Sequence, residues 1–375
     1  MSRRTTRRAV LAAGAVALAG CLGETDSVYD PSDDGVTDAD IDEFDATPDD
    51  DRVSETAIPL ADEQLPVQYD LETLRDNVES GGVPQDGIPS IDSPEFESVD
   101  DVGTRLDDGD VVFGVVRNGE ARAYPQSILV HHEIVNDVVG GDPICVTYCP
   151  LTGTAMGYDR ADVEFGVSGN LLNSNLVMYD REGESYWPQM LSTAIEGPLT
   201  GASLREVSVV WARWGDWRER HPTSEVLTES TGYARDYGSD PYGAYNPVAG
   251  YYEPDSNTMF PPLTTDDRLE TKRMVLGARP QSGPVAVDVD SLHEAGAIPI
   301  ETDEASFLAV AVSNLETGSL YQADDPDEWT VDGDRVRDPD GDAHDPDDLP
   351  LERVYAFDAM WFAWVGYYPG TTLHE

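Results

Sequence analysis

Two stretches of the chain share one pattern of residues at a constant separation. VVFGVVRNGEARAYPQSIL, over 111–129, aligns without gaps on MVLGARPQSGPVAVDVDSL, over 274–292. Gly114 and Gly277 fall at the same place in the two stretches, 163 positions apart (277 − 114). Both stretches predict a strand, a turn, a second strand and a short helix. Chance similarity between two β-hairpins is the alternative, because this pattern is common.

The pattern favours a β-rich α+β fold, with mixed or antiparallel strands, short helices and two pseudo-duplicated halves. The two expected repeats cover about residues 105–190 and 270–370. The second stretch lacks the cysteine and the histidine pair that follow the first. We therefore expect any chemistry to lie in the first half.

The N-terminus carries a targeting pattern. Arg7 and Arg8 precede an apolar run, 9–20, which ends at Cys21. Such a run is too short to cross a hydrocarbon layer about 30 Å thick, so residues 1–21 predict an export signal and not a membrane span. The arginine pair is typical of the twin-arginine route, and the end of the run resembles a lipoprotein cleavage box. We expect a lipid on Cys21 to hold the protein on the outer face of the cell membrane. A plain secretory signal is the alternative.

Acidic residues dominate the chain, with 74 Asp and Glu against 23 Lys and Arg and a formal net charge of -51. Such a surface repels itself unless salt screens it, so we interpret the acidity as adaptation to extreme salinity, where the screening length is only ~3 Å. The shortage of basic residues argues against a nucleic-acid partner. Residues 22–63 predict an acidic disordered tether, because apolar residues are too sparse there to offset the entropy of ordering. Residues 64–375 predict the globular domain.

The stretch PQSILVHHEIVND, which begins at Pro125, predicts a helix. At ~100° per residue, His132 and Asn136 point to the same side as its apolar residues. Glu133 and Asp137 form a neighbouring i, i+4 pair. A polar pair that faces a core must be hydrogen-bonded or must bind something. For His132, a core histidine satisfied by the backbone is the alternative.

The stretch VTYCP ends a predicted strand at Cys149. Cys145 lies on the same face of this strand but about 13 Å away, whereas a disulfide needs Cα atoms within ~7 Å, so we expect two unpaired thiols. Pro150 keeps Cys149 out of the α region, and a helix beginning near Thr152 would direct backbone N–H groups at the sulfur. Such a setting lowers the pKa of a thiol below ~8.5 and favours the thiolate.

Several motifs of the chain resemble a known family. AYPQSILVHHEIVNDVVGGDPICVTYCPLTGTAMGYDR is followed by GNLLNSNLVMYDREGESYWPQ, GYARDYGSDPYGAY and WFAWVGYYPGTTL. Together they closely resemble the family called domain of unknown function 3179, from about Gly87 to the C-terminus. No activity is attached to that family. The resemblance implies a site that includes His132, Glu133, Asn136, Asp137, Cys149 and Pro150. Relatives often have a second cysteine where this chain has Thr152, and some are described as selenoproteins, which implies redox or soft-metal chemistry.

Three kinds of chemistry fit these residue types. A Cys149 thiolate beside His132, helped by Thr152, suits thiol redox chemistry. Cys149 and His132 would also suit a soft metal such as copper. With Asn136, they match the residue types of a cysteine hydrolase or transferase. The alternative of a different class is a non-catalytic binding or assembly protein in which Cys149 is structural.

We therefore expect thiol-redox or metal-binding function outside the cytoplasm, with a copper ion or no cofactor. The candidate site consists of Cys149, His132, Asn136, Glu133, Asp137 and Thr152. The sequence names neither the substrate nor any partner apart from the membrane.

Overall fold

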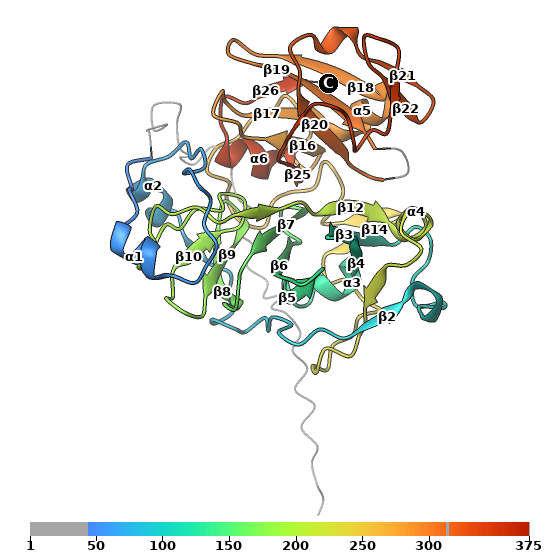
Figure 1. Cartoon of the computed structure of the whole chain (residues 1–375). Coiled ribbons are helices and arrows are strands. Elements are labelled where there is room, and N and C mark those ends of the chain that lie inside the picture. The colour runs from blue at the N-terminus through green and yellow to red at the C-terminus, as the bar shows by residue number, and fades with distance from the viewer. Residues whose placement is uncertain (1–43, 313–314, 375) are drawn as a thin grey trace, which may run out of the picture.

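The computed structural model describes residues 44–312 and 315–374, which form two bodies stacked on each other (Figure 1). Residues before Met274 make the larger body, here called the first half, and residues from Met274 onward make the second half. Strands dominate both halves in antiparallel and mixed sheets, which confirms the predicted β-rich α+β class. Within the described residues, no helix has both the length and the apolar character needed to cross a membrane.

The helices are short. They are α1 (Asp50–Glu55), α2 (Leu71–Asp76), α3 (Gln126–Leu129), α4 (Trp214–Arg220), α5 (Val289–Ala295) and α6 (Trp361–Tyr367), with 3-10 turns at Val99–Asp101 and Pro326–Glu328.

Three sheets form the framework of the first half. The largest has the order β12 (Val210–Arg213), β3 (Val111–Arg117), β4 (Glu120–Pro125), β13 (Glu225–Leu227), β2 (Phe96–Ser98). The second has the order β11 (Glu206–Val207), β7 (Thr154–Asp159), β6 (Asp142–Cys149), β5 (Ile134–Val139). The third has the order β1 (Glu79–Ser80), β8 (Phe165–Leu172), β9 (Asn175–Asp180), β10 (Tyr186–Pro188). A hairpin of β14 (Gly243–Tyr245) and β15 (Val248–Gly250) lies on the way to the second half.

Two sheets of the second half repeat the strand orders of the first two sheets of the first half, except that β2 has no counterpart. One is β25 (Ala356–Met360), β16 (Met274–Ala278), β17 (Val285–Asp288), β26 (Thr372–His374). The other is β18 (Ala297–Glu301), β19 (Ser306–Ala311), β20 (Gly318–Gln322), β24 (Glu352–Val354). The parallel pair β17 and β26 stands where β4 and β13 stand in the first half. A small sheet follows β20 and consists of β21 (Thr330–Asp332), β22 (Arg335–Arg337) and β23 (Ala343–His344).

A glycine and a tryptophan meet in the same way in both halves. Gly114 pairs with Ala123 across β3 and β4, and Gly277 pairs with Ala286 across β16 and β17. A Cβ atom on Gly114 would lie 2.0 Å from the Trp217 ring, and one on Gly277 would lie 2.3 Å from the Trp364 ring. Only a residue without a side chain allows each indole to approach its strand so closely. The predicted alignment therefore marks structurally equivalent positions, while a common origin of the halves stays a prediction.

The boundary predicted for the tether is wrong, because part of the expected tether is folded. Within residues 44–63, the Asp49 side chain accepts hydrogen bonds from two backbone amides and caps α1. Ile58 is buried, and Leu60 forms an isolated β-bridge with Leu204. A few apolar side chains with a helix cap are enough to dock this segment on the first half. The remainder of the predicted tether and the predicted signal up to Cys21 lie outside the described residues.

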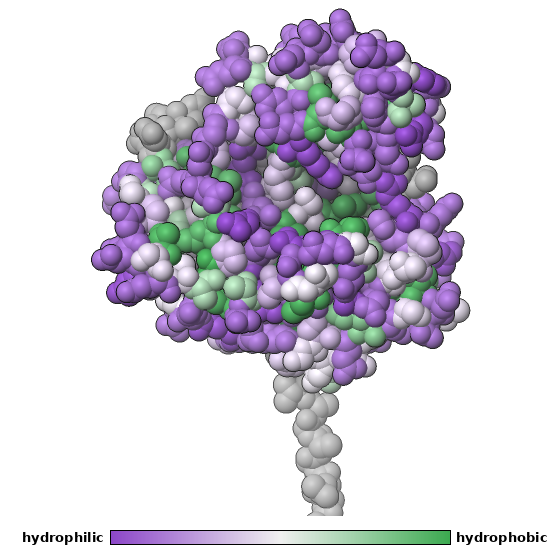
Figure 2. All heavy atoms as spheres, viewed as in Figure 1, coloured by the Kyte–Doolittle hydropathy of each residue, from purple (hydrophilic) through white to green (hydrophobic). Residues whose placement is uncertain are grey.

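The largest hydrophobic cluster extends across both halves. It includes Cys149 and Trp187 from the first half and Met360 and Trp364 from the second. The outer face in Figure 2 is largely hydrophilic, and hydrophobic residues gather near the boundary between the halves. The turn that follows Cys149 lies at this boundary, since the amide of Met360 donates to the Thr152 carbonyl at 2.9 Å.

Candidate functional site

The segment that carries the histidine pair is not the predicted long helix. Helix α3 ends at Leu129, Glu133 has a left-handed φ of 59°, and residues from Ile134 onward form β5. β-Branched side chains populate β5 and favour a pleated strand over a helix, and β6 supplies its hydrogen-bonding partner. His132 and Asn136 therefore do not lie on a common helical face.

His132 is engaged away from Cys149. Its Nδ1 lies 2.8 Å from the Pro89 carbonyl, and its Nε2 lies 2.7 Å from the Tyr237 hydroxyl. A carbonyl only accepts, so Nδ1–H donates to Pro89 and Nε2 accepts from Tyr237. Burial lowers the pKa of His132 to about 4, which keeps the ring neutral. Both ring nitrogens are thus occupied, and the described residues show no contact between His132 and Cys149.

Asn136 and Asp137 also have other partners. The Asn136 side chain donates to the Phe165 carbonyl at 2.9 Å and accepts from the Phe165 amide at 3.0 Å. Asp137 accepts from the Tyr124 hydroxyl at 2.7 Å. These bonds join β5 to β8 and to β4, so both residues support the framework of the first half.

Cys149 ends β6 and pairs with Thr154 at the start of β7. The four residues between them form a hairpin turn, so the helix predicted near Thr152 is wrong. Gly153, at a φ of 61°, supplies the left-handed backbone that such a tight turn requires. Cys149 and Cys145 are both buried and free, which confirms that the two thiols do not pair.

The environment of Cys149 favours the thiol over the thiolate. Burial and the nearby charge of Glu133 raise the pKa of Cys149 to about 11. The Thr152 hydroxyl and the backbone amides of Leu151 and Leu176 act in the opposite direction, but more weakly. The lowered pKa expected from the sequence is therefore wrong. Burial destabilises the thiolate of Cys149 more than these hydrogen-bond donors stabilise it.

The Cys149 thiol donates to the Ser174 carbonyl at 3.8 Å, and Glu133 lies within electrostatic reach of the sulfur. Glu133 is 8% exposed, and burial raises the pKa of its carboxyl to about 8. Within residues 44–312 and 315–374, the carboxyl has no hydrogen-bond or ion-pair partner. Burial raises the pKa of the Tyr242 phenol, and charge on Glu133 or Cys149 adds to the rise, so the phenol lies within electrostatic reach of both groups. A thiol and an unpartnered carboxyl thus share a buried, mostly apolar corner.

A polar network fixes the turn from the side of the third sheet. The Asn175 amide donates to the Thr152 hydroxyl at 3.0 Å and to the Gln189 side chain at 2.8 Å. Gln189 in turn donates to the Thr147 hydroxyl at 2.8 Å and to the Thr154 carbonyl at 3.1 Å. Because Thr152 accepts from Asn175, its own proton is free to point at the sulfur.

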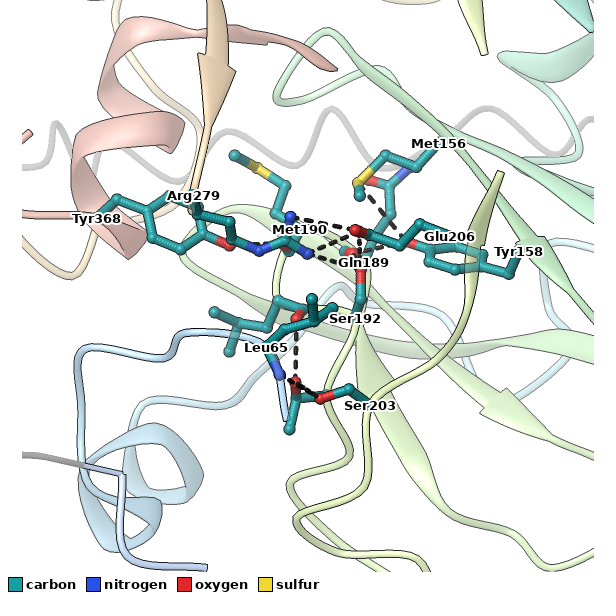
Figure 3. Close-up of polar contacts among 12 residues, drawn as sticks. Leu65, Met156, Tyr158, Gln189, Met190, Ser192, Ser203, Glu206, Arg279 and Tyr368 are labelled. Carbon is teal, nitrogen blue, oxygen red and sulfur yellow. Dashed lines mark hydrogen bonds and ion pairs between the residues drawn. The ribbon is translucent and has the colours of Figure 1, made fainter. Parts of the chain in front are cut away.

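The network continues to the second half through a buried ion pair (Figure 3). The Tyr158 hydroxyl donates to the Gln189 carbonyl at 2.6 Å, and the Ser192 hydroxyl donates to Glu206 at 2.7 Å. Glu206 also accepts from Arg279 at 2.7 Å, with both side chains less than a tenth exposed. This ion pair ties β11 of the first half to the end of β16.

The segment between the two halves covers the site from another side. The Tyr251 hydroxyl donates to the Leu151 carbonyl, inside the turn, at 2.8 Å. The ammonium of Lys272 lies 3.1 Å from the centroid of the Tyr251 ring and donates to the Tyr251 carbonyl at 2.6 Å. Burial lowers the pKa of Lys272 to about 7.

Thioether side chains surround the same turn. A Cβ atom on Gly153 would lie 3.3 Å from the sulfur of Met274 and 3.3 Å from the side chain of Met360. The sulfur of Met190 lies 3.7 Å from the Thr154 hydroxyl. In the part of the chain that the structure describes, no three His, Cys, Asp or Glu side chains gather in a way that would hold a metal. Three methionine side chains therefore lie against the turn that follows Cys149.

Comparison with known proteins supports the resemblance seen in the sequence. The family described as protein of unknown function (DUF3179) matches residues 85–371. The chain belongs to the DUF3179 family. No curated protein and no solved structure matches the chain. The DUF3179 region includes Cys149, Glu133 and Thr152, together with the boundary between the halves.

Of the predicted site residues in this DUF3179 domain, the structure brings Glu133 and Thr152 to Cys149. It places His132, Asn136 and Asp137 in other contacts. The sequence reasoning missed Asn175, Gln189, Tyr251 and Lys272. Lys272 had a signal, since it is the single lysine among 23 basic residues. The others belong to segments that periodicity alone does not connect to the turn.

Proposed function

We propose that the DUF3179 domain of this protein performs thiol redox chemistry outside the cytoplasm, with Cys149 as the reacting group. Glu133 accepts the thiol proton and returns it, and Thr152 donates a hydrogen bond to the sulfur. The observation that carries this proposal is the carboxyl of Glu133, which has no hydrogen-bond or ion-pair partner among the described residues and whose charge adds to the rise that burial causes in the pKa of the Cys149 thiol. A carboxyl with a pKa of about 8 can exchange a proton near neutral pH.

The proposed reaction consumes a hydroperoxide and a low-molecular-weight thiol. The sulfur attacks one oxygen of the hydroperoxide, so an S–O bond forms as the O–O bond breaks. The thiol proton moves to ionised Glu133 and from there to the leaving oxygen, which departs as an alcohol or water. The resulting sulfenic acid condenses with the second thiol, releases water and leaves a mixed disulfide. A further thiol attacks that disulfide and restores Cys149, so the cycle converts two thiols and one hydroperoxide into a disulfide, an alcohol and water.

Trapping of the sulfenic acid tests this proposal. The protein is treated with an equimolar organic hydroperoxide in the presence of dimedone, and modified peptides are identified by mass spectrometry. We expect the adduct on Cys149 and not on Cys145, which is buried on the same strand and serves as the internal control. A Glu133→Gln variant cannot accept the thiol proton, so it should form the adduct more slowly than the wild type when the two are compared at equal fractions of thiolate. Absence of an adduct on Cys149 at any pH would refute the redox proposal and favour a structural cysteine.

A second candidate function is binding of a soft metal ion such as copper(I). The thioethers of Met190, Met274 and Met360 around the turn favour it, because thiolate and thioether ligands select copper(I). The ion would have to displace the proton of a thiol whose pKa is about 11. Titration with copper(I) against a chromophoric chelator tests this function. Affinity that is unchanged in Cys149→Ser and in Met190→Leu would exclude a site at the turn.

The cysteine hydrolase alternative lacks a histidine beside the sulfur, since the contacts of His132 are made elsewhere. If the Cys149 thiol proves unreactive, the result favours a binding or assembly protein in which Cys149 is structural.

We also propose that the protein is exported and lipid-anchored through Cys21, on the strength of the N-terminal pattern. The net charge of -51 supports a highly saline environment. Replacement of Cys21 by serine should release the protein from membranes into the medium, as followed by fractionation. Retention of the variant in the membrane fraction would refute the anchor.

A further inference from the structure

Lys272 is the single lysine of a chain that otherwise uses arginine, and it is almost fully buried. It lies just before β16, at the base of the second half. Its ammonium donates to three oxygens: the Tyr251 carbonyl at 2.6 Å, the Ser256 hydroxyl at 2.7 Å and the Asn257 carbonyl at 2.8 Å. The backbone amide of Lys272 also donates to the Pro254 carbonyl at 2.9 Å. One side chain therefore holds both ends of the segment 251–257.

The geometry of this contact requires a lysine. Three acceptors converge on a single nitrogen, which matches the three protons of an ammonium group. A guanidinium is planar and longer, so it cannot direct three protons from one point. The Ser256 hydroxyl completes the arrangement, because it accepts from Lys272 and donates to the Tyr251 carbonyl at 2.7 Å. An arginine, the basic residue used at the other positions of this chain, could not donate to all three of these acceptors from one point.

Tyr251 transmits this contact to the reactive turn. Its ring lies between the ammonium of Lys272 and the turn, and its hydroxyl donates to the Leu151 carbonyl. Leu151 is two residues after Cys149, whose thiol is 1% exposed. Burial raises the pKa of Tyr251 and charge on Cys149 adds to the rise, and both residues belong to the same buried hydrophobic cluster. The segment that Lys272 holds is therefore one wall of the site.

We propose that Lys272 is a positioning residue for Cys149: it holds the segment 251–257 closed over the thiol. The closed site admits a small hydroperoxide, while a bulkier thiol reaches the sulfur only when this segment opens. This inference rests on the proposed thiol function and adds to it a selection of reactants by size. Lys272 touches no reacting atom and acts through Tyr251.

Labelling of Cys149 with two thiol reagents of different size tests the inference in the full-length protein. Iodoacetamide is the small reagent and a polyethylene glycol maleimide is the bulky one, and mass spectrometry assigns the labelled cysteine. In the wild type, the bulky reagent should react with Cys149 far more slowly than iodoacetamide. Loss of a single charge-assisted hydrogen bond should raise the open population about tenfold. Lys272→Met should therefore increase the rate with the bulky reagent by at least about this factor and the rate with iodoacetamide much less.

Two variants serve as comparisons. Lys272→Arg keeps the charge but not the three-point geometry, so it should not restore slow labelling by the bulky reagent. Arg268→Gln removes another cation that lies over an aromatic ring, 5.1 Å from the centroid of Trp361, and should leave both rates unchanged. A general loosening of the fold would raise both rates together, whereas the inference requires a change in their ratio.

Tyr251→Phe decides the question if Lys272→Met does not fold, because it removes only the bond to the Leu151 carbonyl. The ratio of the two rates should again change in favour of the bulky reagent. An unchanged ratio in every folded Lys272 or Tyr251 variant would overturn the inference. Because alkylation consumes no peroxide, this result is independent of whether Cys149 forms a sulfenic acid.

Discussion

The buried carboxyl of Glu133 predicts a specific dependence of stability on pH. In the folded protein its pKa is about 8, against an ordinary value of 4.5. Between these values the folded state holds a proton that the unfolded state has lost, so the free energy of unfolding falls as pH rises. The stabilising effect of the bound proton is complete below pH 4.5 and is lost as pH passes through 8. At ~1.4 kcal/mol per pH unit, the fall attributable to Glu133 is about 5 kcal/mol.

Glu133→Gln should remove this fall, because glutamine does not ionise. The free energy of unfolding is measured by urea titration at high salt, followed by tryptophan fluorescence, from pH 5 to pH 9. Between pH 5 and pH 9 the difference between the variant and the wild type should shift in favour of the variant by about 4 kcal/mol, because part of the total fall lies below pH 5. The same variant should lower the pKa of Cys149, since the charge of Glu133 helps to raise it. Iodoacetamide rates against pH report that thiol pKa.

Asp358→Asn is the matched control. Burial raises the pKa of this carboxyl to about 7, and it accepts a hydrogen bond from Thr317 in the second half. The substitution should also flatten the stability profile but leave the pKa of Cys149 unchanged. If Glu133→Gln and the wild type lose stability in parallel between pH 5 and pH 9, the account of Glu133 as a buried, protonated neighbour of the thiol is refuted.

The remaining predictions concern the supports of the site. Glu206→Gln should leave the buried Arg279 unpaired and lower the free energy of unfolding by about 3–5 kcal/mol in urea titrations; a loss under about 1 kcal/mol would contradict it. Thr152→Val should raise the pKa of Cys149 by removing a hydroxyl donor, so iodoacetamide labelling near pH 9 should slow about tenfold, at ~1.4 kcal/mol per tenfold change. Gly277→Ala should lower the free energy of unfolding by about 1–3 kcal/mol, because the added methyl group would crowd the Trp364 indole. An unchanged thermal unfolding temperature would contradict that packing.

The general architecture could be predicted because it depends on local patterns. Gly114 and Gly277 stand at equivalent positions of matching hairpins, and alternating apolar residues marked the strands around them. The free thiols were predictable for a similar reason, since strand geometry alone separates Cys145 from Cys149.

The composition of the site could not be predicted from such patterns. The residues around His132 fit a helical period, but strand pairing with β6 decided the conformation of the residues from Ile134 onward. Tyr251 lies 100 residues beyond Leu151, and no periodicity connects the two. The pKa of Cys149 depends on burial by segments that meet only in the folded chain. The hydrogen-bond donors near the turn, taken alone, therefore predicted a lowered pKa for Cys149, whereas burial raises it.

The bond from the Met360 amide to the Thr152 carbonyl means that residues of both halves hold the reactive turn. A fragment that stops before Met274 would retain Cys149, Glu133 and Thr152. It would expose the turn after Cys149 to water on the side that the second half covers in the whole protein. A change that separated the two halves would therefore uncover the thiol.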